Sequence, residues 1–69
     1  MKLKIRQERE QRKWTLESVA KKLGITKAAY RNIEIGIRRP SYDVLVKLLG
    51  IYGYDDPRRL FAVTDEEKQ

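Results

Sequence analysis

A set of apolar residues at helical spacing, followed directly by a glycine, is the strongest constraint on how this chain folds. Four apolar residues occur with the spacing i, i+3, i+4, i+7, namely Leu16, Val19, Ala20 and Leu23. This spacing places them on one face of an α-helix. Gly24 follows directly, and glycine suits the left-handed position after a helix, with Ile25 packing back on it. We therefore predict a helix over Leu16–Leu23, capped by Thr15, that ends in a sharp turn.

A second helix is predicted directly after that turn, over about Lys27 to Ile35. Thr26 is a suitable N-cap, and Gly36 ends the segment as Gly24 ends the one before it. Tyr30 and Ile33 lie on the face that we expect to be buried. The opposite face carries Lys27, Ala28, Arg31 and Asn32. The unit is thus two short helices joined by a glycine turn, with a polar outer face on the second.

Three further helices complete an all-α prediction. The first covers about Lys2 to Arg12, with Ile5 as its core residue. Another follows the N-cap Ser41 and repeats the apolar spacing at Leu45, Leu48, Leu49 and Tyr52. The last covers about Pro57 to Val63, where Asp56 and Pro57 form a typical helix start. We predict a compact five-helix bundle over residues 1–63 and a polar, disordered tail over 64–69.

The composition excludes several classes of function. A chain of 69 residues has room for one small core, so an enzyme pocket is not expected. Cysteine and histidine are both missing, which excludes disulfides, thiolate chemistry and the usual zinc sites. We predict no catalytic residue, no metal and no cofactor. The charged N-terminus and the lack of a run of ~18 apolar residues predict a cytoplasmic protein.

The net charge of +6 is distributed unevenly along the chain. Residues 1–39 hold twelve Lys or Arg against four Glu, a net charge of +8. Residues 40–69 hold four basic and six acidic side chains, a net charge of −2. The positive field thus lies on the half that contains the two central helices, where it would attract a polyanion. A solvated basic surface without a partner is the alternative interpretation.

The pattern as a whole resembles the helix-turn-helix family of lambdoid phage repressors and Cro proteins, over roughly Lys4 to Phe61. The residues that carry the resemblance are Arg9, the segments 14–20 and 23–26, Tyr30, Ile33, Glu34, Gly36, the segment 39–41 and Leu45. The resemblance implies a five-helix domain that binds double-stranded DNA and regulates transcription as a repressor. It also implies a dimer on a two-fold symmetric operator, in which one reading helix enters each half-site.

The resemblance also assigns roles to individual residues. Base edges in the major groove would be read by Lys27, Ala28, Arg31 and Asn32. Phosphates would be bound by Lys13, Thr15, Leu16, Glu17, Arg38 and Arg39, through backbone N–H groups at the helix start and side chains in the loop. Arg9 and Glu34 would form a partly buried ion pair that joins the first helix to the end of the reading helix.

The chain departs from the family pattern at several positions. Leu16 replaces the usual Gln, so a phosphate contact must be missing or replaced. Glu8 stands where leucine is usual, which reduces the apolar surface of the first helix. Tyr30 replaces Ile or Val, and its hydroxyl needs a partner if it is buried. Ile35 replaces the common Asn and removes one phosphate contact.

Two other functions fit parts of the pattern. A protein-interaction module, such as an antitoxin, antirepressor or co-regulator, would use apolar residues on the outer face of the predicted 27–35 helix, and Ala28 and Ile35 keep this function open. Binding of single-stranded nucleic acid would need exposed aromatic residues, and only Tyr42 and Tyr54 remain for it. Dimer contacts are predicted from exposed apolar residues near the last two helices, with Ile51, Tyr54 and Phe61 as candidates; dimerisation only on DNA is also compatible.

Overall fold

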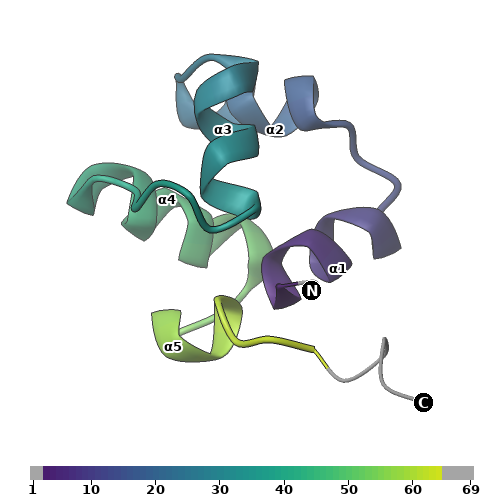
Figure 1. Cartoon of the computed structure of the whole chain (residues 1–69), viewed down its shortest axis with the longest axis vertical. Coiled ribbons are helices and arrows are strands. Elements are labelled where there is room, and N and C mark those ends of the chain that lie inside the picture. The colour runs from purple at the N-terminus through teal and green to yellow at the C-terminus, as the bar shows by residue number, and fades with distance from the viewer. Residues whose placement is uncertain (1–2, 65–69) are drawn as a thin grey trace.

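The computed structural model describes residues 3–64, and its five helices confirm the all-α prediction (Figure 1). The helices are α1 (Lys4–Gln11), α2 (Leu16–Leu23), α3 (Lys27–Glu34), α4 (Tyr42–Tyr52) and α5 (Pro57–Leu60). Helix α2 packs against α3 and α4, and α5 packs against α1 and α4. None of the helices in the described part of the chain is long and apolar enough to cross a membrane.

The ends of the bundle differ from the prediction. Helix α5 ends at Leu60 and does not continue to Val63, because Val63 is extended and forms an isolated antiparallel bridge with Leu3. The N–H of Lys4 donates to the carbonyl of Ala62 at 2.8 Å. This pairing joins the two ends of the bundle. The predicted start of the first helix at Lys2, and the predicted tail apart from Thr64, lie outside the described residues.

The predicted starts of α2, α3 and α4 and the turn after α2 are confirmed. Thr15, Thr26 and Ser41 are N-caps. The side-chain oxygen of each accepts a hydrogen bond from the backbone N–H of the residue three positions later. Gly24 has a φ of 74°, a left-handed conformation that glycine adopts without steric cost. The N–H of Ile25 donates to the carbonyl of Ala20 at 3.0 Å, which closes the turn between α2 and α3.

The core contains a hydrogen-bonded pair of tyrosines. The core consists of the buried residues Ile5, Val19, Ala20, Leu23, Tyr30, Ile33, Leu48, Tyr52 and Leu60. The hydroxyl groups of Tyr30 and Tyr52 lie 2.8 Å apart, so each satisfies the other in the interior. This pair supplies the partner that the sequence required for Tyr30.

The turn between α1 and α2 uses a lysine where the other turns use glycine. Lys13 has a φ of 59°, and among the described residues it is the one non-glycine residue in this conformation. The N–H of Trp14 donates to the carbonyl of Arg9 at 3.2 Å, and that of Lys13 donates to Glu10 at 3.0 Å. These are the bonds of a Schellman ending, which normally has glycine at this position. The Lys13 backbone is therefore strained.

We expect Lys13→Gly to raise the free energy of unfolding by roughly 0.5 to 1 kcal/mol, because relief of left-handed strain exceeds the added flexibility of the unfolded chain. Urea unfolding followed by circular dichroism measures the change. Lys21→Gly is the matched control, because Lys21 lies inside a helix, and it should destabilise by about 1 kcal/mol. A loss of stability in both variants would contradict the strain at Lys13.

Candidate nucleic-acid interface

The outer face of α3 is polar and accessible, as its sequence predicts. Lys27, Ala28 and Arg31 are exposed, and Asn32 is partly buried. On the opposite side of the same helix, Tyr30 and Ile33 are buried in the core. Packing of α3 against α2 thus fixes which side chains face outward. Two cations and one carboxamide remain available on one helical surface.

The start of α2 and the start of α3 line one hollow. Its lining includes Thr15, Leu16 and Glu17 from the start of α2, and Lys27 from α3, and its volume is about 450 Å³. The structure therefore brings three of the predicted phosphate-binding residues next to one of the predicted base-reading residues. Arg9 and Trp14 complete the wall. Sequence periodicity alone could not show this juxtaposition, since it depends on how α2 and α3 cross.

The N-terminus of α2 supplies residues with backbone donors to the lining of that hollow. The Thr15 hydroxyl accepts from the N–H of Ser18 at 3.0 Å. No acceptor within residues 3–64 is assigned to the N–H groups of Leu16 and Glu17. Such groups at the positive end of a helix bind anions. The Leu16 side chain packs against the core, so it contributes apolar packing at the position where the sequence resemblance implied a polar glutamine.

The loop after α3 holds two exposed arginines. The Asn32 carbonyl accepts from the N–H groups of Ile37 at 3.0 Å and Arg38 at 3.2 Å, which fixes the start of the loop. The side chains of Arg38 and Arg39 are exposed and form no hydrogen bond or ion pair with any residue that the structure describes. Both guanidinium groups are therefore available for an anion. Lys13 is also exposed, at the α1–α2 turn.

Arg9 and Glu34 form a bidentate ion pair between α1 and the end of α3. Arg9 Nε lies 2.7 Å from Glu34 Oε2, and Arg9 Nη2 lies 3.2 Å from Glu34 Oε1. Arg9 Nη1 donates to the carbonyl of Trp14 at 2.7 Å. The hydrogen bond to Glu34 outweighs desolvation and raises the pKa of Arg9. The Glu34 side chain is only 3% exposed, so this contact anchors α3 from inside.

A second polar cluster was not found by sequence reasoning. Glu8 accepts from Arg12 Nη1 and from the Tyr54 hydroxyl, both at 2.6 Å. Burial raises the pKa of Glu8, but the hydrogen bonds from Tyr54 and Arg12 outweigh it and hold that pKa below its ordinary value. The spacing of Glu8 and Arg12 is a helical i, i+4 signal, whereas no local signal points to Tyr54. Glu8 therefore gains polar partners where leucine would pack.

The exposure predicted for the dimer contacts is not found in the structure. Ile51, Tyr54 and Phe61 are partly buried against the core, so the structure does not leave them exposed as predicted. Within residues 3–64, the large apolar side chains that are exposed are Ile35, Ile37, Tyr42, Val46 and Val63. Any apolar contact with another molecule would use these residues first. Among residues 3–64, no group of acidic side chains is arranged to hold a metal ion.

The comparisons with known proteins bear on this geometry. The model of a family described as "Helix-turn-helix" matches residues 5–57. The "Uncharacterized HTH-type transcriptional regulator YqaE" of Bacillus subtilis (strain 168) is 44% identical over 43 residues, which cover 62% of this chain and 37% of that protein. The chain thus matches well under half the length of this relative. No solved structure matches the chain.

Proposed function

This chain belongs to the helix-turn-helix family, and on that basis we propose that it is a sequence-specific, double-stranded DNA-binding transcriptional repressor that inserts α3 into the major groove. One observation carries the proposal: Lys27 of the polar α3 face lines one hollow with Leu16 and Glu17 of α2, whose N–H groups have no acceptor within residues 3–64. Repression is the simplest outcome, because occupation of a promoter requires only DNA binding. The proposal includes the cytoplasmic location expected from the sequence.

The base contacts follow from the chemistry of the α3 face. Lys27 and Arg31 can donate to guanine O6 and N7, and Asn32 can pair with an adenine edge. The Ala28 methyl group can contact a thymine methyl group. These four side chains would determine the sequence of a half-site.

Phosphate contacts would surround the reading helix. The N–H groups of Leu16 and Glu17 would bind one phosphate, with Thr15 and Lys13 at the same edge. Arg38 and Arg39 would bind another on the far side of α3. The strain at Lys13 supports its place in this set, because strained residues are often retained at functional sites.

A single α3 helix contacts too few base pairs for useful specificity. We propose that two copies bind a two-fold symmetric operator with half-sites about one helical turn apart. The second copy can join in solution or only on DNA.

Selection of bound duplexes from a randomised DNA pool at ~0.15 M salt tests the proposal, since this salt concentration suppresses purely electrostatic binding. Enrichment of an inverted repeat is the expected result. Enrichment of a single half-site would support sequence-specific DNA binding and would contradict the proposed dimer. A pool that stays random would overturn sequence-specific binding.

Substitutions should separate the two kinds of contact. Lys27→Ala is expected to weaken binding to the selected site by about 1 to 3 kcal/mol and to relax preference at one base pair per half-site. Arg39→Ala should weaken binding to selected and random DNA alike. Arg59→Ala, on α5, removes the same charge and should have little effect. Fluorescence anisotropy on both duplexes measures all three. Equal losses on every sequence for Lys27→Ala would mean that this face does not read bases.

A protein-interaction module remains a second candidate because Ile35 and Ile37, which directly follow α3, are 42% and 74% exposed. Apolar side chains in this position would favour a protein partner. Under this alternative, Ile37→Ser would abolish binding to that partner, and DNA selection would leave the pool random.

A further inference from the structure

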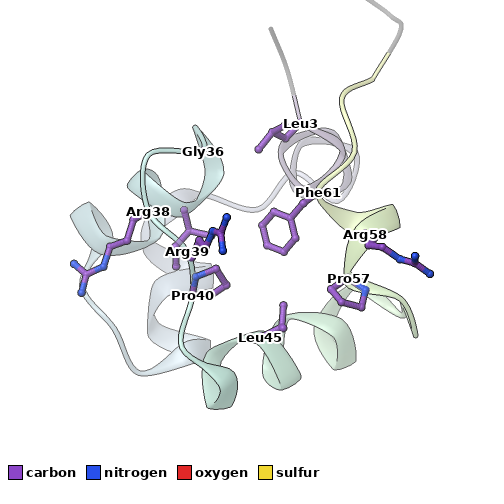
Figure 2. A pocket seen from close by; sticks show the side chains of 10 residues that line it. Leu3, Gly36, Arg38, Arg39, Pro40, Leu45, Pro57, Arg58 and Phe61 are labelled. Atoms are coloured by element: carbon purple, nitrogen blue, oxygen red, sulfur yellow. The ribbon is translucent and has the colours of Figure 1, made fainter.

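A second hollow lies beside the loop after α3, away from the outer face of that helix (Figure 2). It is open to solvent and is lined by residues from the start of α1, from α3, the α3–α4 loop, α4 and α5, and its volume is about 630 Å³. Its apolar lining consists of Leu3, Ile33, Pro40, Leu45, Pro57 and Phe61. This volume lies within the range of pockets that bind small organic molecules.

One cation points into this apolar hollow. Figure 2 shows the Arg39 guanidinium directed toward the Phe61 ring, whereas the side chains of Arg38 and Arg58 point away from the hollow. Arg58 is engaged with Asp56, at 3.2 Å between Nη2 and Oδ2. Arg39 forms no hydrogen bond or ion pair with any part of the chain that the structure describes. An open apolar hollow with one guanidinium directed into it is complementary to an anion that carries an apolar chain or ring.

We propose that this hollow binds a small monocarboxylate with an apolar chain or ring, and that this ligand competes with DNA. The carboxylate would form a two-pronged charge-assisted hydrogen bond with Arg39, which suits a planar guanidinium. The apolar body would lie against Leu45 and Phe61, where burial removes it from water. The second half of the proposal rests on the proposed function, because it takes Arg39 as a phosphate contact. One guanidinium cannot serve both anions, so binding of each weakens the other.

NMR titration of the protein with octanoate, without DNA, tests the pocket. Saturable shifts of resonances from Leu45, Phe61 and Arg39 are expected. Octanol has the same chain without the charge and acetate has the charge without the chain, so each should bind at least about ten-fold more weakly. Shifts confined to other residues, or no saturation with octanoate, would overturn the proposal.

Two arginine substitutions distinguish specific binding of octanoate in the hollow from general attraction of octanoate to a basic protein. Arg39→Gln is expected to weaken octanoate binding about ten-fold. Arg31→Gln removes the same charge from the outer face of α3, which does not line the hollow, and should change binding less than two-fold. Both positions are exposed, so both variants should fold. Equal weakening in the two variants would show that charge alone attracts octanoate, and the assigned site would be wrong.

A competition measurement then tests the link to DNA. Octanoate at saturating concentration should weaken binding of wild-type protein to the selected duplex, and octanol should not. Octanoate binding without any DNA binding would refute the proposed function and leave the pocket standing. DNA binding that saturating octanoate does not change would refute the competition alone.

Discussion

Glu34→Ala is expected to lower the free energy of unfolding by about 3 to 5 kcal/mol, because it leaves the Arg9 guanidinium largely buried without its partner. A domain of this length has a total stability of roughly 3 to 10 kcal/mol. The variant should therefore be largely unfolded at 37 °C, and DNA binding should fall with it. Urea unfolding at low temperature measures the loss.

Two variants make this prediction specific to the buried pair. Glu10→Ala breaks an ion pair with Arg6 whose side chains are 46% and 40% exposed, and should cost under about 0.5 kcal/mol. The double replacement Arg9→Met with Glu34→Leu removes both charges, and should be more stable than Glu34→Ala. If Glu34→Ala unfolds at the same urea concentration as the wild type, the ion pair does not anchor α3.

Alkaline pH is expected to unfold the domain through its buried tyrosines. Burial is the main cause that raises the pKa of both Tyr30 and Tyr52, and the charge of Glu34 adds to it. These hydroxyl groups thus keep their protons in the folded state at a pH where the unfolded chain loses them. Their contribution to stability is complete below the ordinary tyrosine pKa of about 10 and declines above it. Each such group should remove about 1.4 kcal/mol per pH unit in that range.

The free energy of unfolding, measured in urea between pH 8 and 11.5, should decline steeply above pH 10. Tyr30→Phe should make this decline shallower, although it also lowers stability at pH 8 by about 1 to 3 kcal/mol through loss of the Tyr52 hydrogen bond. Tyr42→Phe is the matched control, since Tyr42 is 78% exposed, and should follow the wild type. A decline that Tyr30→Phe leaves unaltered would mean that other groups drive alkaline unfolding.

Local signals predicted most of the fold. The N-cap Thr15, the helical spacing of apolar residues and Gly24 are close together in the sequence, and they determine α2 and the turn after it. The N-cap Thr26 marks the start of α3 in the same local way. The early end of α5 could not be predicted, because it depends on pairing with Leu3 at the other end of the chain. The left-handed conformation of Lys13 could not be predicted either, because a glycine usually marks such a turn and lysine does not.

In the candidate interface too, features within one helix were predictable from the sequence and features between elements were not. The polar face of α3 follows from periodicity within a single helix. The hollow shared by α2 and Lys27 depends on how two helices pack, and the link from Glu8 to Tyr54 spans most of the chain. The Arg9–Glu34 contact was expected from the family resemblance alone. Interactions between distant residues require either such a resemblance or the structure itself.

The pairing of Leu3 with Val63 also governs how the domain would respond to mechanical force. Because these residues are antiparallel neighbours, tension applied at both ends would act directly on the hydrogen bond between the Lys4 N–H and the Ala62 carbonyl. The seam between α1 and α5 would open first. The α2–α3 unit lies inside this seam in the chain, so pulling would reach it last.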